Sequence, residues 1–383
     1  MARLPGNTGK EFIMTELPHI IDNTVYYDCL TAPIEVNGLY RPHTTGKFYR
    51  LPDELLNDMS INLGARERAK RSAGGRVRFA TDAACVTVEA SLQAINSRSK
   101  HFSIGGKAGI DIYVAERGTN NMLYRQCFFP ALTNINPDDG LAEGEIKETY
   151  YFNIHDTHAE HEVMLHLPNF AELNFLRIGL PEGAQLYAPR PYAHPKPILA
   201  YGSSISQGCA ASRPGNVWLQ HISRWLDIDT INLGFSGSDK GEAAIAHFIG
   251  QQDISLFVMG YEANAGSNAH LKATHRPFYE IVRAAQPDLP ILIASMPRFP
   301  RVVNHHNPNK TDRIQSEIEV LATYNYGIAR GDRNLYFLSG TTMYGTRDQD
   351  ACIVDHAHPN DLGFMRIAEA MRPAILNALQ RVY

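Results

Sequence analysis

The stretch that decides the fold is residues 188–208, APRPYAHPKPILAYGSSISQG. Its first part, Ala188–Pro197, contains four prolines, which exclude a continuous helix or a central strand. Its second part is a short apolar run, Ile198–Tyr201, that ends in a cluster of glycine and serine. We therefore expect an extended linker at residues 189–197, followed by the first buried strand of a new domain.

Beyond the linker, short apolar runs alternate with longer stretches of helical periodicity. The runs expected to be strands are Ile198–Tyr201, Thr230–Leu233, Ile254–Met259, Ile291–Ser295 and Leu335–Leu338. The stretches expected to be helices are Val217–Leu226, Gly241–Phe248, Thr274–Ala285, Thr311–Arg330 and Asp361–Leu379. Strands that are apolar on both faces indicate a parallel sheet covered by helices. Residues 198–383 are therefore predicted to form a doubly wound α/β domain around a five-stranded parallel sheet.

Before the linker, the pattern is that of an antiparallel β domain. Short alternating or β-branched runs are separated by turn residues, and few stretches have helical periodicity. The runs expected to be strands are Val77–Thr81, Cys85–Ala90, Gly109–Val114, Glu148–Asn153, Glu162–Leu167 and Phe175–Leu180. Residues 1–188 are therefore predicted to form an all-β sandwich of the jelly-roll kind.

Length and composition are those of a globular protein with two domains. The 383 residues exceed one ordinary core, 44% of them are hydrophobic, and the formal net charge is −4. A slightly acidic chain without a long basic run argues against nucleic-acid binding. No apolar run approaches the roughly 18 residues of a membrane span, and the N-terminal residues lack an apolar secretion signal.

The five cysteines are scattered along the chain and include no Cys-x-x-Cys pair. This usage favours free thiols in a reducing compartment. We therefore expect a cytoplasmic protein, with export through a signal that has been removed as the alternative. No nucleic-acid or membrane partner is expected, whereas an exposed edge of the sandwich would allow a homo-oligomer.

Polar residues follow four of the predicted parallel strands at the point where each strand ends. Ser204 follows the first strand, Gly237 the second, Asn264 the third, and Asp355 and His358 the last. The carboxyl ends of parallel strands meet at one edge of the sheet, which is where ligands bind in open α/β folds. Four segments that are far apart in sequence are therefore expected to converge on one site.

The residue types in these segments suit nucleophilic catalysis. A serine hydroxyl needs a base to accept its proton as it attacks, and His358 is the candidate base for Ser204. Asp355, three residues earlier, would orient the imidazole and stabilise its positive charge. The backbone N–H groups of Ser204 and Gly237 and the side-chain amide of Asn264 would donate hydrogen bonds to an oxyanion.

The four segments resemble the four sequence blocks of the SGNH, or GDSL-type, hydrolases. The matching segments are Gly202–Gly208, Asn232–Gly237, Gly260–Asn264 and Asp355–Asn360, in the order and approximate spacing of that family. The resemblance implies Ser204 as nucleophile, Asp355 and His358 as the rest of the triad, and Gly237 and Asn264 as oxyanion donors. It also implies a flavodoxin-like three-layer fold that needs no metal or other cofactor.

The combination of a β-sandwich with such a domain resembles a subgroup that carries an N-terminal jelly-roll domain. That subgroup includes carbohydrate esterases and the acyltransferase of a tetracycline-type polyketide pathway. Two positions depart from the family pattern. Ser203 stands where the first block usually has Asp, and Asn264 lies four residues after Gly260, a longer loop than the usual Gly-x-Asn-Asp.

Structural roles compete with each of these assignments. Ser204 alone could be a helix cap or a turn residue, and Gly237 could serve only as a turn glycine. The segment from Asp355 to His358 could instead hold a metal, although no further spaced ligand pair accompanies it. Tyr261 and Glu262 are weaker candidates for substrate contact, with a structural role as the alternative.

The favoured interpretation is a serine ester hydrolase that works through an acyl-Ser204 intermediate. The expected substrate is a short acyl ester, such as an acetyl ester, of a carbohydrate or small molecule, and the carbohydrate part rests on the resemblance alone. An acyltransferase that passes the acyl group to an alcohol is the second interpretation. A non-catalytic carbohydrate-binding protein is the third, and the intact Ser204, Asp355 and His358 argue against it.

Overall fold

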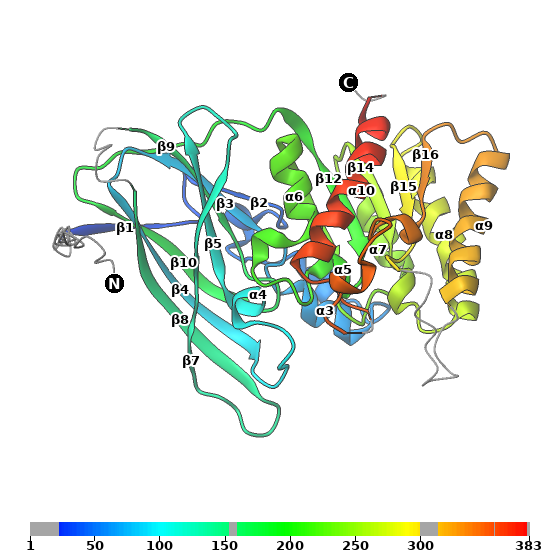
Figure 1. Ribbon diagram of the computed structural model, residues 1–383, viewed down its shortest axis with the longest axis horizontal. Coiled ribbons are helices and arrows are strands. Elements are labelled where there is room, and N and C mark those ends of the chain that lie inside the picture. The colour runs from blue at the N-terminus through cyan, green and yellow to red at the C-terminus, as the bar shows by residue number, and fades with distance from the viewer. Residues whose placement is uncertain (1–22, 153–158, 299–312, 356, 381–383) are drawn as a thin grey trace, which may run out of the picture.

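The chain folds into a β-rich N-terminal part and a C-terminal part in which helices surround a parallel sheet (Figure 1). The computed structural model describes residues 23–152, 159–298, 313–355 and 357–380. The predicted fold class, antiparallel β followed by α/β with five parallel strands, is confirmed. Among the described helices, none is both long and apolar enough to cross a bilayer.

The N-terminal part consists of two antiparallel sheets. The first has the order β1 (Thr24–Asp28), β10 (Glu172–Pro181), β4 (Cys85–Asn96), β8 (Leu141–Tyr151) and β7 (Ala131–Thr133). The second has the order β11 (Leu186–Tyr187), β3 (Arg76–Thr81), β9 (His161–His166), β5 (Ile110–Glu116) and β6 (Leu123–Phe128), with β2 (Glu35–Asn37) paired to β3.

One hydrophobic core lies between these two sheets. The alternation in β4 turns Val86 and Val88 inward, where they share a buried cluster with Val77 and Phe79 of β3 in the other sheet. Six of the strands overlap the runs predicted from alternation, whereas β1, β2, β6, β7 and β11 are short or irregular and were not predicted. The jelly-roll topology itself stays a prediction.

The C-terminal sheet is parallel throughout. Its strand order is β13 (Ile228–Gly234), β12 (His194–Gly202), β14 (Leu256–Gly260), β15 (Ile291–Ala294) and β16 (Leu335–Leu338). This is the order 2-1-3-4-5 of flavodoxin-like folds. Gly202 pairs with both Gly234 and Gly260, so three strands end at the same level. The loops that follow them therefore start side by side.

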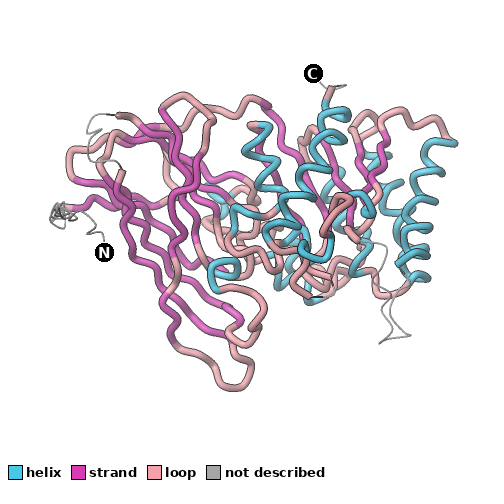
Figure 2. The backbone as a smooth tube through the Cα atoms, viewed as in Figure 1, coloured by secondary structure: helices cyan, strands magenta, loops and turns pink. Residues whose placement is uncertain are grey.

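Helices cover both faces of this sheet (Figure 2). One face carries α6 (Trp218–Leu226) and α10 (Asp361–Leu379). The other carries α7 (Ala243–Gly250), α8 (Asn268–Ala285) and α9 (Arg313–Ala329). All five helices overlap the predicted ones.

A helical segment from the first half of the chain packs on the C-terminal part. After α1 (Pro42–Thr45), the helices α2 (Asp53–Leu56) and α3 (Leu63–Ala69) bury Leu56 and Ala65 in one cluster with Ile245 of α7. The predicted domain boundaries place this segment with the sandwich and start the C-terminal domain at residue 198, whereas β12 begins at His194. The boundaries stay predictions, because packing alone does not define where a unit folds.

The two parts are joined by buried polar contacts centred on Arg76. This side chain is 0% exposed and donates to Gln220 Oε1 and Thr230 Oγ1, both at 2.8 Å, and to the Thr230 carbonyl at 2.9 Å. It also forms an ion pair with Asp229 and donates to Tyr192 Oη at 3.2 Å. A β3 residue is therefore tied to α6 and β13 of the other part.

We expect Arg76→Met to lower the free energy of unfolding by about 3–5 kcal/mol, because it removes one partner of a buried charged network. Arg177→Met is the control, since Arg177 pairs with Glu89 at the surface, where such a pair contributes at most about 1 kcal/mol. Urea unfolding followed by circular dichroism measures both. If both substitutions lowered the free energy of unfolding by the same small amount, the buried contacts of Arg76 would not stabilise the protein as expected.

Candidate active site

Ser204 is the first residue of the short helix α5 (Ser204–Gln207), which follows the end of β12 after a sharp turn at Ser203. Ser203 caps this helix, because its Oγ accepts a hydrogen bond from the Ile205 N–H at 3.2 Å. A short polar side chain that caps a helix explains how Ser can stand where the family usually has Asp. The turn holds the Ser204 side chain at the carboxyl edge of the sheet, where it is 8% exposed.

Close backbone packing shapes this turn. A Cβ at Gly234 would clash with the backbone nitrogen of Gln207, and one at Gly202 would clash with Ser206 Oγ. Gly208 ends the helix with φ of +104°. Glycine at these positions therefore lets the serine loop lie directly against β13.

His358 joins Ser204 to Asp355. Its Nε2 lies 3.0 Å from Ser204 Oγ, and its Nδ1 lies 2.7 Å from Asp355 Oδ2. Asp355 Oδ1 accepts from the backbone N–H groups of Ala357 and His358, both at 2.8 Å. Because a carboxylate only accepts, Nδ1 carries the proton, and Nε2 is left free to accept from the serine hydroxyl.

The Asp355 carboxylate is held in its ionised form. Partial burial acts to raise its pKa, but the hydrogen bonds from the His358 side chain and from two backbone N–H groups outweigh it and lower the pKa to about 2. The folded-state value lies below the ordinary 3.8, so this carboxylate favours the folded state above about pH 4. That contribution is lost as the pH falls towards 2.

Two backbone N–H groups, those of Ser204 and Gly237, are the predicted oxyanion donors of this site. The Ser204 N–H opens helix α5, and the first N–H groups of a helix have no acceptor within it. Gly237 follows β13 with φ of +72°, and a Cβ there would meet no atom within 4 Å. Neither N–H donates to a backbone carbonyl among the loop and turn bonds of the described residues.

The Asn264 side chain is fixed by a buried carboxyl group. Asn264 ends a short 3-10 helix, Glu262–Asn264, and its Nδ2 donates to Asp239 Oδ1. Asp239 is fully buried, which raises the pKa of its carboxyl well above the usual range, and its Oδ2 has no partner among the described side-chain atoms. Lys240 Nζ donates to the Asn264 carbonyl. The amide nitrogen of Asn264 therefore has a defined orientation, with one N–H committed to Asp239.

Both halves of the chain match family models. Residues 195–376 match the GDSL-like lipase/acylhydrolase family, and residues 24–186 match the N-terminus of SGNH-hydrolase-type esterases. The chain belongs to the SGNH, or GDSL-type, hydrolases. By family it is a carboxylic ester hydrolase. No curated protein matches the chain in sequence.

Solved structures of other proteins resemble this SGNH hydrolase over most of its length. A protein described as a GDSL-like lipase from Bacteroides ovatus is 24% identical, with a TM-score of 0.79 over 94% of this chain and 98% of its own. The salicylyl-acyltransferase of a tetracycline biosynthetic pathway is 20% identical, with a TM-score of 0.71 over 93% of this chain and 98% of its own. A family two carbohydrate esterase from Clostridium thermocellum is 14% identical, with a TM-score of 0.53 over 80% of this chain and 93% of its own. At these identities the likeness shows the fold.

Asp239 was not singled out by the sequence, and its role in this SGNH hydrolase is testable. We expect Asp239→Ala to lower kcat by about 10-fold or more, because the Asn264 amide loses its anchor, and the loss of an oxyanion donor costs up to about 1,000-fold. Asp239→Asn retains an oxygen acceptor and should lose less. Steady-state hydrolysis of p-nitrophenyl acetate measures both variants.

A double-mutant cycle provides the control for Asp239. If Asp239 acts through Asn264, the Asp239→Ala substitution should change kcat little when Asn264 is already Ala. Glu242→Gln is the matched variant, since Glu242 accepts from Tyr201 and the Lys240 N–H but not from Asn264. Additive losses from Asp239→Ala and Asn264→Ala would show that the two residues act separately.

Tyr261 and Glu262 lie in the interior of this SGNH hydrolase, away from solvent. Tyr261 is completely buried and donates from its hydroxyl to Thr274. Glu262 is buried and accepts from the Met296 N–H at 2.8 Å and from the Ser316 hydroxyl. This burial favours the structural alternative, and substrate contact by these two residues stays a prediction. In the sequence, Tyr261 and Glu262 are polar neighbours of Asn264 and suggest contact with a ligand. In the structure, their polar atoms form hydrogen bonds with other protein groups.

The N-terminal part contributes two residues next to the triad. The Phe102 ring meets the His358 ring edge to face, with centroids 5.6 Å apart. His101 Nε2 lies 3.7 Å from Asp355 Oδ2, and its side chain is 50% exposed. Phe102 also stacks on the buried Phe170. No pattern in the sequence pointed to these residues, because they come from a loop some 250 positions before His358.

Other reactive groups near the site are unsuited to catalysis. Cys209 is buried below Ser204, and burial raises the pKa of its thiol to about 12, so it does not supply a thiolate near neutral pH. All five cysteines are buried and free. Within the described part of the chain, no three His, Cys, Asp or Glu residues are grouped so as to hold a metal ion.

Proposed function

We propose that this SGNH hydrolase cleaves short acyl esters of a carbohydrate or small molecule through an acyl-Ser204 intermediate. The observation that carries the proposal is the continuous hydrogen-bonded series from Ser204 Oγ through the His358 ring to Asp355, with steps of 3.0 and 2.7 Å. A nucleophile, its base and a group that orients the base are thus within hydrogen-bond reach of one another.

Acylation begins with attack of Ser204 Oγ on the ester carbonyl carbon. The hydroxyl proton passes to His358 Nε2, and Asp355 stabilises the resulting imidazolium. As the tetrahedral intermediate collapses, the bond from the carbonyl carbon to the alcohol oxygen breaks. The imidazolium then gives its proton to the departing alcohol, which leaves the acyl group on the serine.

Deacylation repeats these steps with water as the nucleophile. His358 accepts a proton from water as the water oxygen bonds to the acyl carbon, and it returns that proton to Ser204 Oγ when the acid leaves. In both halves, negative charge on the carbonyl oxygen would be met by the N–H groups of Ser204 and Gly237 and by the remaining amide N–H of Asn264.

Active-site labelling tests this proposal directly. A fluorophosphonate forms a stable bond to an activated serine, so we expect one equivalent to attach to Ser204, as located by peptide mass spectrometry. Asn360→Ala is a useful comparison, because Asn360 caps α10 two residues after His358 and should alter stability more than labelling. An unlabelled, folded protein would instead support the non-catalytic carbohydrate-binding alternative.

Acyl transfer to an alcohol is the second candidate. Its support is the restricted access of water, since Ser204 is 8% exposed and the His358 side chain 22% exposed. A structurally similar protein is described as a salicylyl-acyltransferase. Product analysis in the presence of an added sugar or simple alcohol separates the two candidates. A transferred ester as the main product would favour the acyltransferase.

A further inference from the structure

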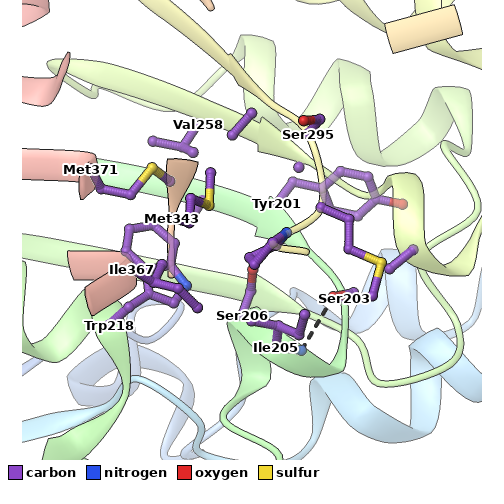
Figure 3. A pocket seen from close by; sticks show the side chains of 16 residues that line it. Tyr201, Ser203, Ile205, Ser206, Trp218, Val258, Ser295, Met343, Ile367 and Met371 are labelled. Carbon is purple, nitrogen blue, oxygen red and sulfur yellow. Dashed lines mark hydrogen bonds between the residues drawn. The ribbon is translucent and has the colours of Figure 1, made fainter. Parts of the chain in front are cut away.

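A small pocket lies behind the serine loop, on the face of the sheet covered by α6 and α10, and its lining is mainly apolar apart from Ser203, Ser206 and Ser295 (Figure 3). Its volume is about 40 Å³. Trp218, Ile367 and Met371 lie at one end of the pocket, and Ser203 lies at the other. The first three are buried members of the core beneath the sheet edge.

The pocket opens at the catalytic edge of the sheet. Its partly exposed lining residues are Gly260, Ala263, Met296 and Pro297, whereas Trp218 and Met371 are buried. Ser203 and Ala263 line it, and each is the chain neighbour of a proposed catalytic group, Ser204 and Asn264 respectively. Consecutive Cα atoms are about 3.8 Å apart. The pocket lining therefore comes within one residue of both the nucleophile and the oxyanion amide.

We propose that this pocket binds the acyl chain of the substrate and restricts it to unbranched aliphatic chains of about two to four carbons. The proposal rests on the proposed function, because it assumes an acyl group on Ser204. In this proposal, the acyl carbon bonded to Ser204 Oγ directs its oxygen towards Asn264 and its alkyl chain into the pocket. Inside, methyl, thioether and indole groups offer an apolar surface to an alkyl chain.

The size of the pocket sets the limit on the chain. A cavity needs roughly 10–15 Å³ of such volume for one water-sized group, so 40 Å³ accommodates about three small groups. Acetyl, propionyl and butyryl chains place one to three carbons beyond the carbonyl. A benzoyl or salicylyl ring has about twice that number of ring atoms and does not fit without displacing the side chains at the end of the pocket.

Thioether side chains make the length limit adjustable by mutation. Met343 and Met371 both line the pocket, and a methionine replaced by alanine removes several atoms from its wall. We expect Met371→Ala to raise the ratio of kcat/KM for p-nitrophenyl hexanoate over acetate by at least about tenfold, since one methylene in an apolar pocket is worth about 10- to 200-fold. The matched control is Met365→Ala, which changes the same residue type on the exposed side of α10.

A second variant narrows the pocket at a partly exposed position, so its folding does not require the buried core to accept a changed side chain. Met296 is partly exposed, and Met296→Trp should lower the ratio for butyrate over acetate by at least about tenfold, while acetate is still hydrolysed. The wild-type enzyme should hydrolyse acetate, propionate and butyrate and lose at least about tenfold on hexanoate and benzoate. Thermal unfolding shows which variants are folded.

The possible results separate the pocket from the catalytic mechanism. Wild-type ratios in folded Met371→Ala and Met296→Trp proteins, with acetate hydrolysis retained, would overturn the role of the pocket and leave the mechanism standing. If Met371→Ala does not fold, the Met296→Trp ratio decides. Wild-type enzyme that hydrolyses benzoate as readily as acetate would also overturn it. Failure to hydrolyse any of the esters would overturn the proposed function and the pocket together.

Discussion

Replacing Ser204 by Ala is expected to lower kcat for p-nitrophenyl acetate by about 10⁴- to 10⁶-fold, because no other group takes its place as nucleophile. Cys209 is buried as a thiol below the loop, and His358 would have no hydroxyl to deprotonate. The fold should survive, since the change removes one oxygen from the first residue of a short helix. Circular dichroism and steady-state kinetics provide the comparison.

The neighbouring serines are matched controls for Ser204. Ser203→Ala removes the helix cap, at about 1 kcal/mol of stability, but leaves Oγ of Ser204 and its base in place. We expect its kcat to stay within about tenfold of the wild-type value. Retained hydrolysis in a folded Ser204→Ala protein would remove Ser204 from the mechanism.

Replacing Asp355 by Asn is expected to lower kcat by about 10⁴-fold, because an amide can donate to His358 Nδ1 and thereby stabilise the wrong tautomer. The Asp355 carboxyl itself should add no pH dependence to this loss between pH 5 and 9. The pKa of Asp355 is about 2, so the wild-type carboxylate is ionised throughout that range and gains no proton that the amide would mimic.

Asp350→Asn is the control for this charge change, since Asp350 is exposed in the same loop and has no contact with His358. Rates measured as a function of pH for wild type, Asp350→Asn and Asp355→Asn show whether the loss varies. A folded Asp355→Asn protein with the wild-type kcat at pH 8 would contradict the role of the carboxylate in orienting His358.

Much of the fold could be predicted from local patterns. The apolar strands of the parallel sheet have no polar face, and the strands of the sandwich alternate along their length, so both sets were located. Their lengths were less well predicted, since β4 ends six residues later and β8 begins seven residues earlier than expected. Short strands such as β7 and β11 carry too few residues to show a period. Helices α2 and α3 pack on a distant α7, which no local pattern could indicate.

Some residues of the candidate site could likewise be predicted from the sequence, and others could not. Ser204, Asp355 and His358 follow strand ends, so the topology of a parallel sheet was enough to bring them together, and the structure places them in hydrogen-bond contact. Their catalytic roles stay predictions. Asp239 and Phe102 were missed because their importance depends on burial and on contact between distant segments, neither of which has a sequence signal.

The contact of Phe102 with His358 has a consequence for how this enzyme could be divided or redesigned. The Phe102 ring, from the N-terminal half of the chain, covers one side of His358, so the candidate active site includes residues of both halves. A catalytic half cut free of its partner would keep all three triad residues and yet expose the imidazole to water. A triad transferred alone onto a minimal scaffold would lack the Phe102 ring in the same way. Substitutions where the two halves meet would change the surroundings of His358, and therefore its reactivity, without altering a triad residue.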